Sequence, residues 1–163
     1  MIAHDGAEIT VIATLVTDPK ASFIVDSLTL DDFAFPEHRI IFEAIAALVS
    51  DGTTPSAAML TASLRGMTAG GMPAPLYLLK IQHHAVPLTA LTAFVRMLKE
   101  FTGRRAMVQI AEHMAQVAPD ATQPILAFND DICAQLDGIS ASMRQSRQTT
   151  FALEDMAQQT IAR

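Results

Sequence analysis

Residues 88–118 limit most strongly how this chain can fold, because they contain no proline and only one glycine. An uninterrupted helix over this stretch would extend about 45 Å at 1.5 Å per residue. Beyond a break at Pro119 and Asp120, apolar residues recur at spacings of three or four. They are Ile125, Phe128, Ile132, Leu136, Ile139 and Met143. This spacing is typical of a coiled-coil seam and predicts a second long helix.

A matching apolar stripe lies on the first long helix. It consists of Leu91, Phe94, Leu98 and Phe101 and, beyond an interruption at Gly103-Arg104-Arg105, of Met107, Ile110, Ala111 and Met114. Two antiparallel helices joined by a short loop bury such stripes as a helical hairpin. Packing within one chain can account for most of these residues, but contacts with other copies would use the same stripes. We expect the hairpin seam and its contacts to be formed by Phe94, Leu98, Phe101, Phe128, Ile132, Leu136 and Ile139.

The segment 31–45 combines a turn with the start of a helix. Pro36 fits the first helical turn because it lacks an amide hydrogen and its φ is already near the helical value. Apolar residues then recur on one stripe, and Gly52 marks the stop. The stripe consists of Ile41, Phe42, Ile45, Leu48 and Val49. A helix that begins at Pro36 and ends before Gly52 is predicted.

Other short helices are indicated in the first half of the chain. Asp5-Gly6-Ala7-Glu8 resembles a capping box ahead of an apolar run. Thr54-Pro55 resembles a helix cap followed by proline, and three apolar residues supply the buried side of the helix that follows. These are Met59, Leu60 and Leu64. Gly70-Gly71 marks a loop before a further short helix.

These elements predict an all-α protein in three parts. The first is a compact head of about six short helices at residues 1–87, and the second is a long antiparallel helical hairpin at residues 88–145. The third, residues 146–163, is expected to be a tether with the start of a further helix.

Composition limits the classes of partner. Charged residues make up 17% of the chain, against about 25% in an average soluble domain, so a partner is expected to cover part of the surface. Residues 1–87 hold nine acids and four bases, which offers nucleic acid no basic surface and predicts weak or absent DNA contact. The single cysteine, the acidic N-terminus and the lack of a long apolar run favour a cytoplasmic protein without a membrane partner.

Catalytic and metal-binding patterns are absent from the sequence. It has no Gly-x-x-x-x-Gly-Lys-Ser/Thr loop, which ATP hydrolysis of the P-loop type requires. His83 and His84 diverge by about 100° on a helix, and the other histidines lie in unrelated segments. The acid pairs Asp31-Asp32 and Asp130-Asp131 suit helix starts, and Cys133 has no base placed beside it. We therefore expect no catalytic residue, cofactor or metal ligand in this chain.

The order of motifs resembles one known family. An acid and an apolar helix end in an Asp-Pro turn at Asp18-Pro19, and an Asp-Phe turn precedes His38-Arg39-Ile40-Ile41-Phe42. A Gly-Gly loop leads into Tyr77-Leu78, Val86-Pro87 opens the long helix, and Arg104-Arg105 follows within it. From Glu8 to about Arg144 this order is similar to the N-terminal domain of the bacterial replicative DNA helicase of the DnaB type. Met72-Pro73-Ala74-Pro75 departs from the family by adding residues to the loop.

The resemblance implies a function in assembly during DNA replication, without catalysis by this chain. Such domains pair through heads and hairpins and close into a collar of up to three dimers, where primase and the helicase loader dock in the primosome. The motor that uses ATP and Mg²⁺ would be a RecA-like domain beyond Arg163. His38, Arg39, Arg104 and Arg105 are candidates for contacts with subunits or primase. Phe151, Leu153 and Met156 would form the apolar face of the linker helix, held loosely until it meets a neighbouring motor domain.

Two alternatives remain open from the sequence. The chain could be a free-standing helical adaptor or inhibitor that mimics the helicase collar. It could also be an unrelated helical ligand-binding protein or metal enzyme that uses its histidines or acids in an internal cavity.

Overall fold

The computed structural model describes the backbone of residues 5–119 and 124–161 and the side chains of residues 5–119 and 124–159. Its elements are α1 (Asp5–Thr17), η1 (Pro19–Ser27), η2 (Leu30–Asp32), α2 (Pro36–Ser50), α3 (Ala57–Ser63), β1 (Thr68–Ala69), β2 (Met72–Pro73), α4 (Ala74–Ile81), η3 (Gln82–His84), α5 (Leu88–Val117) and α6 (Ile125–Ile161). The elements η1 to η3 are 3₁₀ helices. The two short strands pair antiparallel. The predicted all-α class is therefore confirmed.

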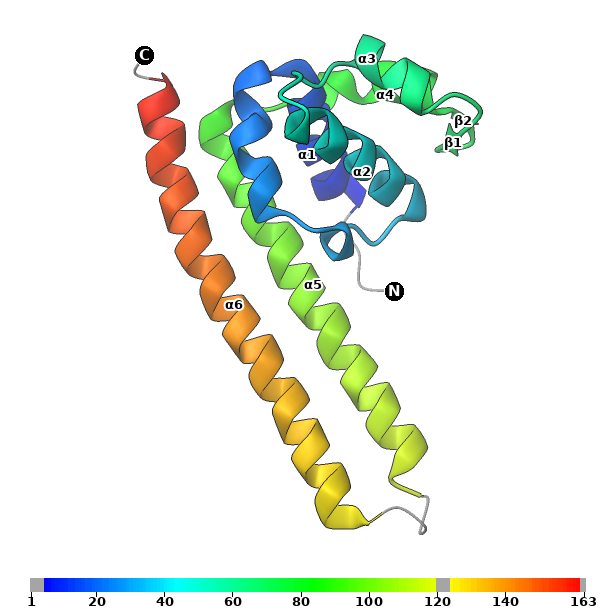
Figure 1. Ribbon diagram of the computed structural model, residues 1–163, viewed down its shortest axis with the longest axis vertical. Helices are drawn as coiled ribbons and strands as arrows, with labels where there is room; N and C mark the ends of the chain where they lie inside the picture. Colours follow the sequence, from blue (N-terminus) through cyan, green and yellow to red (C-terminus); the bar gives the residue numbers. More distant parts are fainter. Residues whose placement is uncertain (1–4, 120–123, 162–163) are drawn as a thin grey trace.

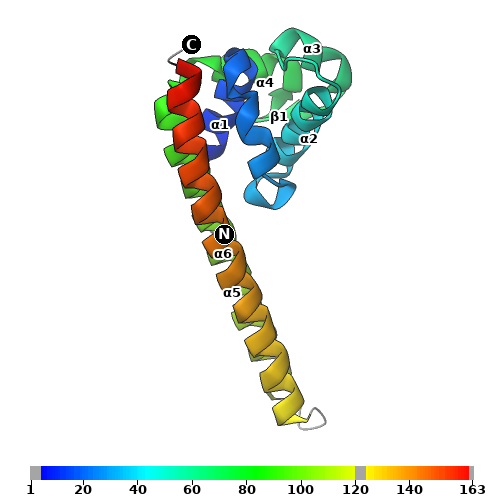
Figure 2. The same cartoon turned by 60° about the vertical axis from the view of Figure 1, so that its left-hand side comes forward.

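The two long helices form a hairpin that projects away from the head. α5 and α6 run antiparallel and side by side along their whole length (Figure 1). The head packs beside the end of the hairpin where α5 begins and α6 ends, and the other end extends well beyond it (Figure 2). This arrangement confirms the predicted order of a compact head followed by a long antiparallel hairpin.

The helix α1 forms the centre of the head. Val11, Ile12, Ala13 and Leu15 have no exposed surface, so the helix is buried on all sides, as expected for a helix without a polar face. It packs against α2, α4, η3 and α5. One core therefore joins the head to the base of the hairpin.

The helix α2 confirms the prediction for its segment. It begins at Pro36 and ends at Ser50, and Gly52 follows with a φ of 71°. Ile41, Phe42 and Ile45 face the core, and the ring of Phe42 stacks on that of Phe33 at 4.7 Å.

The two predicted caps differ from the observed ones. Glu8 turns its carboxylate away from the start of α1 and toward residues 34–38, as described below. α3 begins two residues after Pro55, where the Ser56 hydroxyl accepts a hydrogen bond from the amide of Met59. Leu60 and Leu64, four residues apart, face the core, and Met59 is consequently left on the exposed side.

The Gly-Gly loop is a tight turn between β1 and β2, and it lies against the ring of Tyr77. Gly70 and Gly71 both have positive φ, which glycine adopts without strain. A Cβ atom at Gly70 would lie 2.8 Å from the Tyr77 ring, so only glycine allows this approach. The added residues that depart from the family are ordered here, because Met72–Pro73 form β2 and Ala74 begins α4.

No tether separates the hairpin from residues 146–161. α6 is one unbroken helix of 37 residues that returns to the head and packs beside η1 and α5. Leu153, expected to be loosely held, is 4% exposed and belongs to the head's core. Neither proline nor glycine occurs between residues 139 and 161, so nothing in the sequence breaks the helix there.

Candidate subunit interface

A buried polar network holds α1, α2 and α4 together. The carboxylate of Glu8 on α1 accepts hydrogen bonds from the backbone amides of Ala34 at 2.7 Å and Phe35 at 3.4 Å. It also lies 2.8 Å from Nδ1 of His38, whose Nε2 lies 2.7 Å from the hydroxyl of Tyr77. Because a carboxylate is an acceptor, Nδ1 carries the proton, and in the neutral ring Nε2 accepts from Tyr77. Glu8 thus holds in place the backbone that leads into α2.

The phenol of Tyr77 is held in its protonated form by this setting. Burial raises the pKa of Tyr77 to about 12, and the negative charges of Asp5, Glu37 and Glu8 act in the same direction. Between pH 10 and 12 the unfolded chain has lost a proton that the folded chain still holds. Raising the pH through this window therefore lowers the stability of the fold, whereas below pH 10 the contribution of Tyr77 is complete.

Spectroscopic titration can test this shift without interference, because the chain has one tyrosine and no tryptophan. We expect the near-ultraviolet absorbance of the phenolate to appear with a midpoint about two pH units higher in the folded chain than in urea. Equal midpoints would show that Tyr77 is not enclosed. Tyr77→Phe should abolish the signal and reduce the loss of stability between pH 10 and 12.

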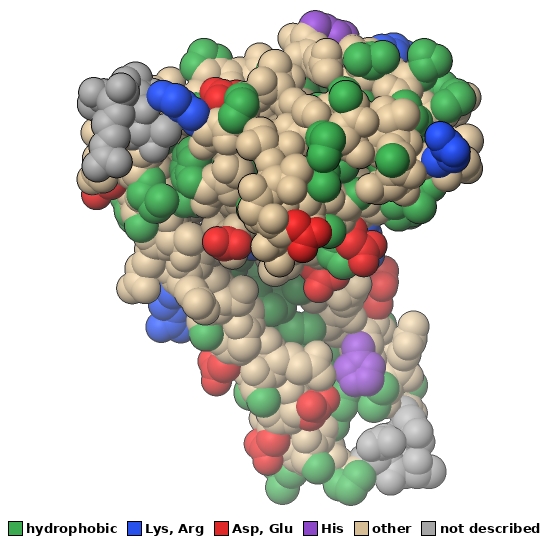
Figure 3. Space-filling view, turned by 45° about the horizontal axis from the view of Figure 1, so that its top comes forward, with side chains coloured by type: hydrophobic (Ala, Val, Ile, Leu, Met, Phe, Trp, Pro, Cys, Tyr) green, Lys and Arg blue, Asp and Glu red, His purple; other side chains and the backbone are tan. Residues whose placement is uncertain are grey.

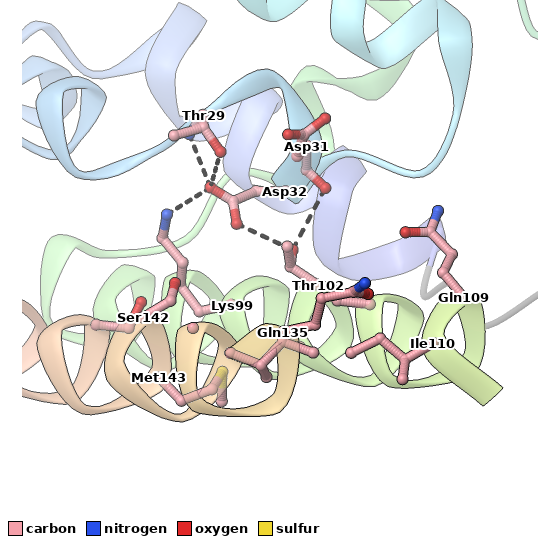
Figure 4. Close-up of a pocket in the computed structure, with 15 residues that line it drawn as sticks. Thr29, Asp31, Asp32, Lys99, Thr102, Gln109, Ile110, Gln135, Ser142 and Met143 are labelled. Carbon is pink, nitrogen blue, oxygen red and sulfur yellow. Dashed lines mark hydrogen bonds and ion pairs between the residues drawn. The ribbon is translucent and has the colours of Figure 1, made fainter. Parts of the chain in front are cut away.

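A second polar cluster joins the head to the hairpin (Figure 4). The buried carboxylate of Asp32 accepts from the amide and hydroxyl of Thr29, from Nζ of Lys99 at 2.5 Å and from the hydroxyl of Thr102 at 2.9 Å. Arg105 donates to the backbone carbonyl of Asp31. Three side chains of α5 are therefore fastened to η2, which fixes the angle at which the hairpin leaves the head.

The four predicted partner contacts occupy different settings. His38 is buried, and both ring nitrogens are bonded within the chain. Arg39 is exposed, and its Nε donates to the carbonyl of Phe33 at 2.6 Å. Arg104 forms an exposed ion pair with Glu100, and Arg105 binds η2. The chain therefore presents Arg39 and Arg104 to solvent and encloses His38.

The predicted seam residues fall into three groups. Leu98 and Ile132 are buried, and Leu98 also belongs to the core that joins the head to the hairpin. Phe94, Phe101, Phe128 and Ile139 are partly buried. Leu136 is 39% exposed. Leu136 is thus the seam residue that its own chain covers least, and contact with another copy remains a prediction for it.

The observed seam of α6 continues beyond the predicted one. Buried or partly buried residues recur every seven positions in two series. One series is Ile132, Ile139, Ser146 and Leu153, and the other is Met143, Thr150 and Ala157. Phe151 and Met156, predicted to share the linker stripe with Leu153, lie outside this seam and are exposed.

The part of the hairpin beyond the head leaves much apolar surface uncovered. Its exposed large apolar side chains are Met107, Val108, Met114, Ile125, Leu126 and Leu136. Leu126, near the start of α6, has 78% of its surface exposed. Two packed helices bury only the sides that face each other. The apolar side chains on their other sides are therefore available for contact with another helix or another chain.

A cavity of about 540 Å³ lies beside the seam, where η2 faces α5 and α6 (Figure 4). Asp32 and Lys99 lie at the head side of this cavity, and Ile110, Ile139 and Met143 line its hairpin side. At this point the chain itself therefore leaves part of the seam uncovered. Among the residues that the structure describes, no group of three or more His, Cys, Asp or Glu side chains could hold a metal ion.

Sequence reasoning missed Glu8, Asp32, Lys99 and Tyr77 as structural polar residues. Each bonds to residues distant in the chain, and their own local patterns suggested helix starts or surface positions. The one available signal was an acid followed by a strongly apolar helix, because a carboxylate on a helix that is buried on all sides needs internal donors. Within the described helices, none has the length and apolar character to cross a membrane.

Comparison with known proteins identifies the family. A family model described as the DnaB-like helicase N terminal domain matches residues 3–100. No curated protein matches the chain. Among solved structures, the N-terminal domain of DnaB helicase from Mycobacterium tuberculosis has a TM-score of 0.72 and 20% sequence identity, with 83% of this chain and 97% of that chain covered. At this identity the structural likeness concerns the fold alone, but the family model covers more than half of the chain. The chain therefore belongs to the family of DnaB-like helicase N-terminal domains.

Proposed function

We propose that this chain is the non-catalytic oligomerisation and partner-docking part of a DnaB-like replicative DNA helicase. It pairs through its hairpin into dimers, which assemble further into a collar of up to three dimers. Primase and the helicase loader dock on this collar, while ATP and Mg²⁺ belong to a separate RecA-like motor domain. Family membership supports this proposal over the alternative of an unrelated helical ligand-binding protein or metal enzyme, and the adaptor alternative differs in whether a motor domain is attached.

The observation that carries the proposal is the uncovered apolar surface of the projecting hairpin. Six large apolar side chains, which are leucine, isoleucine, valine and methionine, face solvent there among polar ones, although the exposed side of a helix in a monomer is mostly polar. Fully burying one exposed leucine contributes about 1.5–3 kcal/mol, and association costs about 4–15 kcal/mol in translational and rotational freedom, so most of these side chains are needed for a stable dimer. The cavity beside Ile139 and Met143 offers room for a side chain of a second copy.

Sedimentation velocity over a concentration series tests this proposal. Wild-type chain should associate, and Leu126→Asp should raise the Kd for association about tenfold or more, because it places a charge in the apolar contact. Ala134→Asp, exposed on the opposite side of α6 from Ile125 and Leu136, adds the same charge outside the apolar surface and should leave the Kd nearly unchanged. A wild-type chain that is monomeric at every concentration, or a Leu126→Asp variant that associates like wild type, would contradict the proposal.

A further inference from the structure

The cavity of about 540 Å³ at the joint between head and hairpin has room for a small molecule. Its head side is formed by η2 and the residues before it, and its other side is formed by α5 and α6 (Figure 4). Figure 3 shows hydrophobic side chains in the recess where the hairpin leaves the lower edge of the head. Ligand sites in proteins occupy about 300–1,000 Å³ and are mostly apolar with a few polar groups. The cavity therefore has the size of such a site.

Two helical glycines line this space. A Cβ atom at Gly103 on α5 would lie 2.7 Å from Sδ of Met143, so the two helices approach closely beside the cavity. A Cβ atom at Gly138 on α6 would instead meet no atom within 4 Å. Glycine weakens a helix relative to alanine, and no described residue packs against Gly138 closely enough to require it. The effect of Gly138 on the structure is therefore to leave the cavity open.

The lining combines apolar side chains with hydroxyl groups. Ile110 is 7% exposed, and Ile139 and Met143 are partly buried; all three line the cavity. The hydroxyls of Ser142 and Ser146 also line it and form no hydrogen bond to any residue that the structure describes. A hydroxyl can both donate and accept a hydrogen bond. The cavity thus offers an apolar surface together with polar groups that a ligand can use.

The charged groups beside the cavity are paired or turned away from it. The carboxylate of Asp32 accepts from Nζ of Lys99 at 2.5 Å and from the hydroxyl of Thr102 at 2.9 Å. The carboxylate of Asp31 is exposed and points away from α5 and α6 (Figure 4). Asp31, Asp32 and Lys99 are the charged members of the described lining. An ion would lose hydration here without gaining an unpaired opposite charge, so the cavity suits an uncharged ligand.

We propose that the cavity at the joint is a binding site for uncharged, mainly apolar organic molecules that carry a hydrogen-bonding group. The apolar part of the ligand packs against Ile110, Ile139 and Met143, and its polar group binds the hydroxyl of Ser142 or Ser146. Such a ligand contacts the head and the hairpin at once, so its binding favours the angle at which the hairpin leaves the head. This site goes beyond the proposed function, which requires no small molecule.

Fluorescence titration with N-phenyl-1-naphthylamine tests the site. This probe is uncharged and mainly apolar, carries one N–H group, and fluoresces strongly only when it leaves water. The full chain carries Leu126→Asp, which weakens association, so that the titration reports on single chains. We expect saturable binding to a single site. Gly138→Leu fills the cavity and should raise the Kd for the probe about tenfold or more.

Ser140→Leu is the matched control for Gly138→Leu. It adds the same side chain to the opposite, exposed side of α6 and should leave the Kd for the probe nearly unchanged. Both positions are exposed, and thermal melts confirm that both variants are folded. If the probe does not bind, or if Gly138→Leu binds it as tightly as Ser140→Leu does, the site is overturned, because any bound probe then lies elsewhere.

Titration of the chain without Leu126→Asp separates the site from the proposed function. It is carried out above the concentration at which the chain associates. If association abolishes probe binding, the cavity is a contact between copies, so the small-molecule site is overturned and the hairpin dimer stands. Binding that persists with the same dependence on Gly138 supports the site, whether or not the hairpin dimer forms.

Discussion

Replacing Glu8 by alanine is expected to lower the free energy of unfolding by about 3–5 kcal/mol. The carboxylate is 1% exposed and is the shared acceptor for the amides of Ala34 and Phe35 and for the ring of His38. Its removal leaves these donors buried without an acceptor, and each unsatisfied donor costs about 1–3 kcal/mol. Urea unfolding followed by circular dichroism measures the change, provided the slope of the transition is unaltered.

Asp5→Ala is the matched control for this prediction. Asp5 lies in the first turn of the same helix but is exposed, so its removal should cost less than about 1 kcal/mol. Glu8→Gln should fall between the two, because an amide keeps one acceptor but turns a donor toward groups that already donate. Equal stability of Glu8→Ala and Asp5→Ala would show that the network does not hold the head together.

The hairpin could be predicted from the sequence because residues close together in the chain determine where its two helices form. A proline-free stretch and apolar residues at helical spacing determine where α5 and α6 form and which sides face each other. The end of the seam could not be found in this way. Ser146 and Thr150 interrupt the apolar pattern, yet the hydroxyl of Thr150 bonds to the carbonyl of Ser146 and so can be buried in the seam.

The buried polar network could not be predicted from local sequence patterns, for a different reason. Glu8 and His38 are 30 residues apart, and His38 and Tyr77 are 39 residues apart. Their bonds exist only after α1, α2 and α4 have packed, and no spacing rule connects them. A histidine and a tyrosine in amphipathic helices equally suit a surface, so only the assembled head reveals them as a buried chain of hydrogen bonds.

The side that a short helix presents was also hard to predict. The sequence predicts that Met59 shares the buried side of α3 with Leu60 and Leu64, but Met59 is 48% exposed. Only one side of a two-turn helix can face the core, and Leu60 with Leu64 occupies it. The exposed methionine and leucines of α3 and α4 therefore belong to the surface.

The C-terminal part of α6 depends on few contacts with the head. A cavity of about 280 Å³ lies between η1, α5 and α6. Its lining is mostly polar and includes Asp26, Ser27, Thr149 and Thr150, while Val95 and Leu153 are its apolar members. Among the side chains that the structure describes up to residue 159, Leu153 and Ala157 are the buried apolar ones in this part of the helix. Leu153 therefore supplies most of the apolar surface that attaches it to the head.

Leu153→Ala should accordingly destabilise the attachment by about 2–5 kcal/mol, the range for replacing a buried leucine by alanine. We expect faster amide hydrogen exchange over residues 146–161, with the centre of the head unchanged, since local regions can open without global unfolding. Phe151→Ala removes a larger but exposed side chain from the same turn and should leave exchange there nearly unaltered. Equal exchange rates in the two variants would mean that the end of α6 is held by something other than Leu153. The predicted loosely held linker would then describe this segment better than a helix fastened to its own head.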